Sequence, residues 1–307
     1  MTTSAAKSLF SAAYQSPPML LTLTALFWAG NAIAGNLAAG EVSPMFLTFL
    51  RWSLVSAALW ALFGRQTLAY WPVLKPKLLS LVLMASFGFA IFNGFLYTAS
   101  LSTTAINIGI MQGSMPVLVL AGAYLLQNAP LSRLQALGVA ITIAGVVVVA
   151  SQGAPHKLLE IGLNPGDALM FCACLCYAGY ALALKDRPQI PGLLFFTAMA
   201  PVAALVSIPM AATEYALGYF QAPTPFGWAL ALWIAVFPSF LSQIFFLRGV
   251  DLIGPGRAGV YINLVPVFAA ILAVLILDQR FAGFHAAALL LVLAGLWIAQ
   301  RPSAQRD

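Results

Sequence analysis

Ten apolar segments, each about 20 residues long, fill almost the whole of this chain. A helix needs about 20 apolar residues to cross roughly 30 Å of hydrocarbon. Hydrophobic residues make up 62% of the chain and charged residues only 7%, whereas roughly a quarter of an ordinary soluble domain is charged. The sequence therefore predicts an all-α polytopic membrane protein with ten transmembrane helices. They are expected at 19–39, 44–64, 78–100, 104–126, 133–151, 165–184, 191–212, 226–247, 255–277 and 282–300.

The basic residues are spread unevenly over the connecting segments. With the N-terminus placed in the cytoplasm, eleven of the 14 Lys and Arg residues lie in cytoplasmic segments, two (Lys157 and Arg280) lie outside, and Arg51 lies within a helix. Cytoplasmic loops of membrane proteins carry such an excess. We therefore expect residues 1–18 and 301–307 to be cytoplasmic tails. The net charge of +6 is explained in this way and does not indicate a nucleic-acid partner.

The second half of the chain repeats the first. An offset of 150 residues places Pro116 on Pro266 and aligns the third to fifth helices with the eighth to tenth. At an offset of 149, LFWAGNAIA in the first helix lies over LCYAGYALA in the sixth. Because five is odd, the two copies enter the membrane from opposite sides. The pattern predicts two inverted five-helix repeats, residues 19–151 and 165–300, as in transporters that present one central site to each face in turn.

Polar side chains inside the membrane segments indicate a central cavity, since such residues usually face a bundle interior or water. Asn93 and Gln243 are equivalent in the two repeats, so we expect them on opposite walls. An alternative, that these amides only join helices, remains open. The predicted cavity residues are Trp28, Asn31, Phe89, Asn93, Tyr97, Gln112, Tyr177, Tyr180, Gln243 and Tyr261.

Two matched pairs of residues predict places where the helices bend. Pro116 and Pro266 interrupt the fourth and ninth helices, and a proline within a helix removes one backbone hydrogen bond. Gly88 and Pro238 weaken the third and eighth helices at the same depth. We expect these four residues to act as hinges or gates, with close helix packing as the alternative for the second pair.

The positions of the charges limit the chemistry of the predicted cavity. None of the eight acidic residues falls at mid-membrane, so the cavity is expected to be amphipathic and uncharged, and proton antiport through a buried carboxylate is disfavoured. Amides can bind a carboxylate and aromatic faces an ammonium group, which suits a zwitterion. Arg51 must find carbonyls, a cavity or the interface, and both a structural and a substrate-binding role are open for it.

Motifs of other protein classes are weak in this sequence. GPGRAG at 254–259 fits a dinucleotide-binding pattern but follows a membrane helix instead of a strand. Cys172, Cys174 and Cys176 lack the spacing of a zinc site. The sequence holds no P-loop and no His, Asp or Glu cluster of the kind that a membrane-embedded lipid enzyme needs. We expect no cofactor, no metal site and no enzymatic activity.

Small residues recur at seven-residue spacing in the fifth and tenth helices. Gly138 and Gly145 share one helix face, as do Ala288 and Gly295. Such faces permit close helix contact. They predict packing within the fold or at a homodimer face, so both a monomer and a homodimer remain open.

Two long segments resemble a known family. STTAINIGIMQGSMPVLVLAGAYLL (102–126) and GPGRAGVYINLVPVFAAILAVLILDQRF (254–281) are similar to the paired EamA domains of the drug/metabolite transporter superfamily. Within that superfamily the chain resembles the YddG-like exporters of aromatic and other amino acids. The resemblance implies that Arg51 is a structural arginine of the family. It also implies a Glu before the prolines of the fourth and ninth helices, where this chain has Met115 and Val265.

The resemblance and the cavity together predict a function in transport. We expect an exporter of small metabolites, most of all aromatic and other neutral amino acids, in a bacterial-type inner membrane and working by alternating access. A carrier of another solute, such as a drug, a sugar or a nucleotide-sugar, is the alternative. A passive channel and a membrane-embedded lipid enzyme are further alternatives. The expected partners are the solute and the lipid bilayer.

Overall fold

The computed structural model describes residues 14–154 and 164–300, which are helical and contain no strand. Nine helices in this part of the chain are long and apolar enough to cross a membrane, and Gly283–Ala299 is a shorter apolar helix. The predicted all-α polytopic fold is confirmed. The elements are α2 (Pro17–Leu37), α3 (Pro44–Ala69), α4 (Trp71–Leu74), α5 (Leu78–Ala85), α6 (Phe92–Ala99), α7 (Ala105–Gln112), α8 (Met115–Gln127), α9 (Arg133–Ala150), α11 (Pro165–Ala183), α12 (Gly192–Ala216), α13 (Pro225–Ile234), α14 (Ser242–Ile253), α15 (Pro255–Ile262), α16 (Val265–Leu277) and α17 (Gly283–Ala299).

Local sequence signals determine where many of these helices begin and end. Prolines occupy the first position of α2, α3, α11, α13 and α15, where a missing N–H leaves no hydrogen bond unmade. Ser132 and Gln135 form a capping box at the start of α9. Asn128 and Asp278 end α8 and α16 in the left-handed conformation, with φ of 52° and 50°. These two residues are 150 positions apart, so the repeat extends to the caps.

The third and eighth membrane spans are distorted at the same place. The π-helical segment η2 (Ser86–Ile91) joins α5 to α6, and η4 (Ala235–Leu241) joins α13 to α14. Gly88 lies in η2 and Pro238 in η4. The residues predicted to weaken these helices therefore lie within non-α segments at equivalent positions of the two repeats.

The fourth and ninth spans each contain a two-residue turn just before the proline at which the sequence predicts a bend. The chain leaves the α-helix at 113–114 and again at 263–264. Pro116 and Pro266 then lie in the first turn of α8 and α16. A proline in the first turn of a helix leaves no hydrogen bond unmade at its nitrogen, and the hinge role expected for these two prolines stays a prediction.

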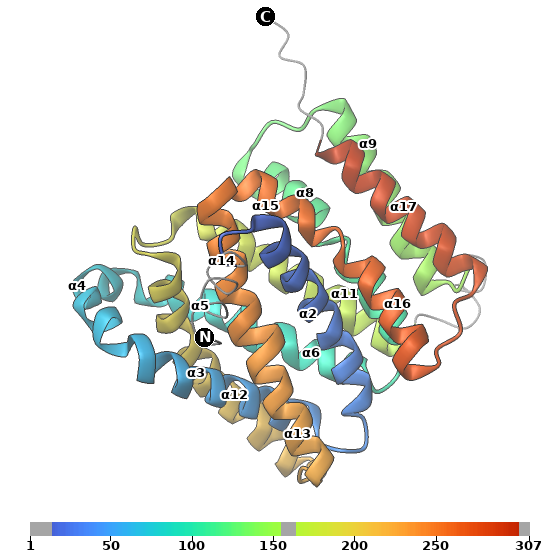
Figure 1. The fold of residues 1–307 in the computed structure, drawn as a ribbon. Helices are drawn as coiled ribbons and strands as arrows, with labels where there is room; N and C mark the ends of the chain where they lie inside the picture. Colours follow the sequence, from blue (N-terminus) through green and yellow to red (C-terminus); the bar gives the residue numbers. More distant parts are fainter. Residues whose placement is uncertain (1–13, 155–163, 301–307) are drawn as a thin grey trace, which may run out of the picture.

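Equivalent helices of the two repeats pack against each other. Figure 1 shows α9 beside α17 at the upper right and α3 beside α12 at the lower left, and both pairs are in extensive contact. The first helix, α2, packs between α14 and α16. The two repeats therefore form one interlocked bundle, with a central site available between them.

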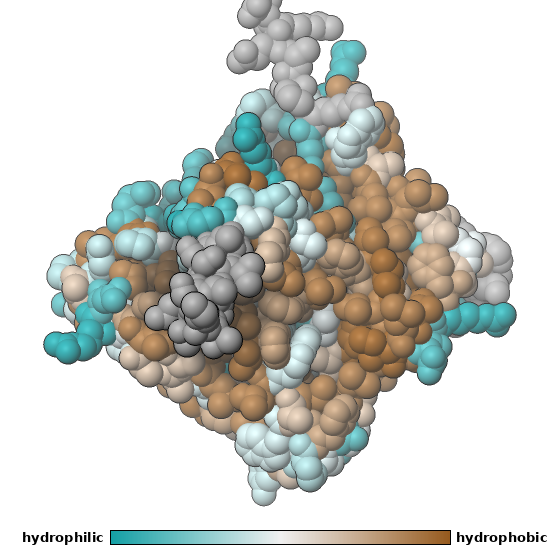
Figure 2. Space-filling model, viewed as in Figure 1, coloured by the Kyte–Doolittle hydropathy of each residue, from teal (hydrophilic) through white to brown (hydrophobic). Residues whose placement is uncertain are grey.

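The outer surface of the bundle is apolar over its middle. Figure 2 shows brown residues across the centre of this face, with teal residues gathered towards its upper-left and left edges and at its lower right. Large side chains such as Leu126, Leu275 and Leu290 are more than two-thirds exposed, at 77%, 73% and 69%. A surface of this kind is suited to lipid, and the bands of polar residues to the two water interfaces.

The small residues of α9 and α17 pack against each other within one chain. A Cβ atom on Gly138 would lie 2.5 Å from the carbonyl oxygen of Gly295, and one on Gly295 would lie 2.6 Å from that of Gly138. These glycines allow the two backbones to touch. The sequence leaves two interpretations of the small residues in α9 and α17: packing within the fold or a homodimer face. The contact between Gly138 and Gly295 accounts for them by packing within the fold.

We predict that Gly295→Ala lowers the free energy of unfolding by about 2 kcal/mol. The added methyl group would meet backbone atoms of Gly138 and Thr142, which cannot rotate away. The measurement is the unfolding temperature of the purified protein in detergent. Gly283→Ala in the same helix is the matched control, since nothing lies within 4 Å of its Cβ position. Equal unfolding temperatures for the two variants would contradict the close contact.

Candidate functional site

A cavity of about 920 Å³ lies between the two repeats. Its wall takes residues from α2, α3, α6 and α8 of the first repeat and from α11, α12, α14 and α16 of the second. Pockets for small molecules typically measure about 300–1,000 Å³. The cavity is therefore large enough for a metabolite of ordinary size.

Most of the side chains predicted for a cavity lie on its wall. Gly88, Pro116 and Pro238 also lie there, whereas Tyr261 and Pro266 do not. Tyr97 is absent from the wall too, but it contacts two residues that belong to it. The predicted residues found on the wall are Trp28, Asn31, Phe89, Asn93, Gln112, Tyr177, Tyr180 and Gln243.

The cavity opens at one end of the bundle. Arg187, Pro191, Asp251 and Pro255 line it and are exposed. Arg187 lies just beyond the end of α11 and Asp251 in the last turn of α14, while Pro191 and Pro255 lie at the starts of α12 and α15. This is the end of the bundle at which α2 begins, and we refer to it as the mouth.

The opposite end is closed by a hydrogen-bond network around Arg51. Its Nη1 donates to Asn31 Oδ1 at 3.1 Å, to Asn93 Oδ1 at 2.5 Å and to the Tyr97 hydroxyl oxygen at 2.6 Å. The Tyr97 hydroxyl donates in turn to Asn31 Oδ1 at 2.9 Å. All four side chains are at least 94% buried. The network joins α2, α3 and α6, so these helices cannot separate here without breaking it.

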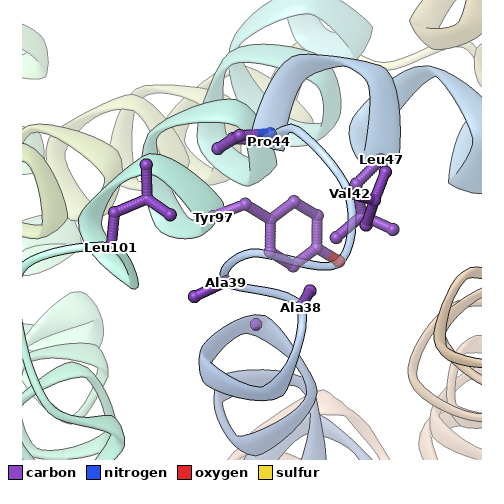
Figure 3. Close-up of a pocket in the computed structure, with 8 residues that line it drawn as sticks. Ala38, Ala39, Val42, Pro44, Leu47, Tyr97 and Leu101 are labelled. Atoms are coloured by element: carbon purple, nitrogen blue, oxygen red, sulfur yellow. The ribbon is translucent and has the colours of Figure 1, made fainter. Parts of the chain in front are cut away.

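Tyr97 packs on the far side of this network from the cavity. Figure 3 shows its ring beside Ala38, Ala39 and Val42 of the turn between α2 and α3 and beside Pro44, the first residue of α3. A Cβ atom on Gly35 would lie 3.2 Å from the same ring, so the glycine allows the ring to approach α2. Tyr97 thus belongs to the closed end and not to the cavity wall, where the sequence predicts it.

Buried acids stabilise the closed end. Glu214 of α12 accepts hydrogen bonds from the backbone N–H groups of Met45 at 3.1 Å and Phe46 at 3.0 Å, in the first turn of α3. A carboxylate is favourable at a helix N-terminus. Asp167 of α11 accepts from the Thr103 hydroxyl group and from Asn107 Nδ2. Each acid joins one repeat to the other.

The cavity is charged, and the expectation of an uncharged one was wrong. Arg51, Arg187, Arg248 and Asp251 all lie on its wall. The sequence leaves both a structural and a substrate-binding role open for Arg51, and the structure places this residue on the cavity wall. The sequence predicts cytoplasmic segments for Arg187, Arg248 and Asp251, but the ends of α11 and α14 extend the cavity to the mouth. The described wall carries three basic groups and one acidic group.

Aromatic rings form much of the cavity wall. Trp52 stacks on Phe89 with ring centroids 4.7 Å apart and 17° between the planes. Phe89 also contacts Tyr180 at 5.4 Å and Phe196 at 5.6 Å. The sequence missed Trp52, Phe92, Phe196 and Phe246, because an aromatic residue in an apolar helix gives no contrast with its neighbours.

The two π-helical segments contact the cavity directly. A Cβ atom on Gly88 would lie 2.7 Å from Cδ2 of Tyr180, so only glycine allows this ring to pack on η2. In η4, Pro238 cannot donate to the carbonyl oxygen of Ile234, and the Ser239 hydroxyl donates to it instead at 2.7 Å. Both segments thus have distinct local reasons for departing from the α-helix.

The described residues hold no group of three or more His, Cys, Asp or Glu side chains placed to bind a metal ion. The three cysteines are free thiols. The polar groups on the cavity wall are amides, hydroxyls, guanidinium groups and the Asp251 carboxylate. These groups can form hydrogen bonds with a solute.

Comparisons with known proteins agree on a family of transporters. A model of the EamA-like transporter family matches residues 16–151 and 164–300. The chain is 25% identical over 286 residues to the uncharacterized transporter YetK of Bacillus subtilis, covering 90% of this chain and 84% of that protein. It is 27% identical over 293 residues to an uncharacterized transporter of Archaeoglobus fulgidus, covering 91% and 96%. A solved structure described only as "Crystal structure of protein" shares the fold, with a TM-score of 0.64 at 18% identity over 92% of this chain and 96% of that one.

We predict that Tyr97→Phe lowers the free energy of unfolding by about 1–3 kcal/mol, because it removes an acceptor from a buried cation. The readout is again the unfolding temperature in detergent. Tyr177→Phe is the matched control, since the Tyr177 hydroxyl makes no hydrogen bond to the described residues. A shift no larger than that of the control would show that the network does not hold the closed end.

Proposed function

The chain belongs to the EamA-like transporter family, and from this premise we propose that it exports small amphipathic metabolites, aromatic and other neutral amino acids first among them. The observation that carries the proposal is the cavity, which both repeats line and which opens at one end only. A binding site of this shape at a repeat interface supports alternating access. A channel would need a path open at both ends.

The cavity wall supports a cargo with both apolar and polar parts. The rings of Phe89, Tyr180 and Trp28 offer apolar faces, and such faces also attract an ammonium group. Gln112 and Gln243 supply amide donors and acceptors on the same wall. Amino acids combine these features in a small volume.

We infer the orientation from the basic residues. Their excess at the tail side favours both termini in the cytoplasm, in the plasma membrane of a bacterial-type cell. In this proposed orientation the mouth faces the cytoplasm, and the cavity is that of an inward-facing state. In this state an exporter takes up its cargo from the cytoplasm.

A second class of cargo is supported by the charged wall. Sugar phosphates and other organic anions need basic groups near the site, and Arg51, Arg187 and Arg248 lie on it. Amino acids remain the first proposal, because the aromatic rings match an apolar side chain better than a sugar. The two classes are separated by uptake measurements.

We predict that proteoliposomes of the purified protein take up radiolabelled neutral amino acids, with phenylalanine, tyrosine, leucine and glutamine as the first panel and glucose 6-phosphate as the anionic comparison. Asn93→Leu removes an acceptor of Arg51 and Gln243→Leu removes an amide from the cavity wall, so each should reduce the rate by a few-fold to about ten-fold. Gln66→Leu, at an exposed position of α3, is the control. Uptake of glucose 6-phosphate alone would replace the amino acid proposal, and unchanged rates in both variants would remove these amides from the site.

We also propose that transport is not driven by protons through a cavity carboxylate. Asp251 is the one acid on the described cavity wall, and it lies exposed at the mouth. Uptake of the same amino acids should therefore proceed equally with and without an imposed pH gradient. Acceleration by the gradient in wild-type vesicles, with no effect of membrane potential, would contradict this.

A further inference from the structure

Two neighbouring N–H groups at the closed end of the cavity have no acceptor among the described residues. They are Nε of Arg51 and Nε1 of Trp52, and both atoms are buried. The two side chains are 6% and 2% exposed, and both lie on the cavity wall. Buried donors in folded proteins are almost always paired. Two unpaired donors on one cavity wall therefore point to a ligand.

The geometry holds both donors in fixed places. Arg51 Cζ lies 5.2 Å from the centroid of the Trp52 ring, so the guanidinium group packs against the indole that carries the second donor. Nη1 of Arg51 makes all three hydrogen bonds of the closing network, which orients the guanidinium plane. The Trp52 ring is fixed by Phe89 at 4.7 Å and by Phe196 at 6.4 Å. Donors that are already positioned bind a ligand with little loss of freedom.

The charge at this place selects the ligand. The three groups that accept from Arg51 are neutral, and no described carboxylate pairs with the buried positive charge. A buried charge without a counter-ion is costly. A ligand with one negative charge and two oxygen acceptors meets both requirements, since one oxygen can accept from each donor. Arg187 and Arg248 at the mouth add a positive field that attracts such a ligand.

We propose that Arg51 Nε and Trp52 Nε1 form the carboxylate-binding subsite of this transporter. The cargo is then a monocarboxylate whose apolar part lies along the Phe89, Tyr180 and Phe196 rings. Arg51 has two roles through different nitrogens, because Nη1 closes the far end and Nε receives the cargo. The subsite depends on the proposed function in one respect, namely that a solute enters the cavity. It does not require the solute to carry an ammonium group.

The test compares acids with their amides on the intact wild-type protein, so that no variant has to fold. Binding is measured by calorimetry in chloride-free buffer with phenylalanine and phenylalaninamide, leucine and leucinamide, and 3-phenylpropionate and 3-phenylpropanamide. At least one acid should bind about 10- to 100-fold more tightly than its amide, as expected when a hydrogen-bonded charge pair is lost. Equal affinity within every pair, or no binding by any acid, would overturn the subsite.

Variants assign the preference to the two donors. Trp52→Phe keeps a ring on Phe89 and removes Nε1–H, so it should weaken binding of the acids about 3- to 10-fold and leave the amides unchanged. Arg51→Lys should abolish most of the difference between acid and amide. Arg65→Gln, at an exposed position in the same helix, is the matched control. If Trp52→Phe weakens acid and amide alike, the indole only packs, and the subsite is wrong.

The outcomes separate this inference from the proposed function. Tight binding of 3-phenylpropionate without binding of phenylalanine or leucine would support the subsite and exclude neutral amino acids as cargo. Amino acid uptake with no preference for acid over amide would support the proposed function and exclude the carboxylate-binding subsite. Addition of chloride tests whether the site binds an inorganic anion instead of a carboxylate. If chloride binds in an Arg51-dependent manner and no acid competes with it, the site belongs to an inorganic anion and the proposal fails.

Discussion

Arg51 carries a positive charge into an apolar bundle, where it is 6% exposed and donates from Nη1 to Asn31, Asn93 and Tyr97. Removing such a charge from water costs several kcal/mol unless its hydrogen bonds are replaced. The three acceptors come from α2 and α6, so satisfying this charge also fixes α2, α3 and α6 against one another. The closed end of the cavity follows from that constraint. Glu214 and Asp167 add contacts between the repeats at the same end.

The backbone features of the first repeat recur in the second, whereas the buried positive charge is found in the first repeat alone among the described residues. The π-helical segments, the interruptions of the fourth and ninth spans and the left-handed caps at Asn128 and Asp278 all recur. The buried positive charge of Arg51 has no equivalent in the second repeat. Positions 148, 149 and 150 residues after Arg51 hold Met199, Ala200 and Pro201. Because the repeats are inverted, the equivalent of the closed end is the mouth. Among the described residues no buried cation holds the mouth shut, which is consistent with a cavity that opens there.

The sequence predicts the fold well because each span carries its own signal. Apolar length places the helices, and Gly88 and Pro238 place the distorted segments. Asn31 and Asn93 are also identified, since an amide in lipid contrasts with its neighbours. The network could not be predicted, because it depends on how three helices are rotated, and no local pattern encodes that rotation. Trp52 gave no signal for a related reason: its unpaired N–H becomes evident only when its surroundings are known.

The pair Asn93 and Gln243 shows what the repeat can and cannot predict. The sequence treats them as equivalent, and both lie on the cavity wall. In the structure, Asn93 Oδ1 accepts from Arg51 and Nδ2 donates to the carbonyl oxygen of Phe89 at 2.7 Å. Its bond to a charged donor is worth about 1.5–3 kcal/mol, more than a neutral contact with a solute returns. Asn93 therefore acts on the solute through Arg51, while Gln243, which makes no hydrogen bond to the described residues, is the amide that can meet the solute directly.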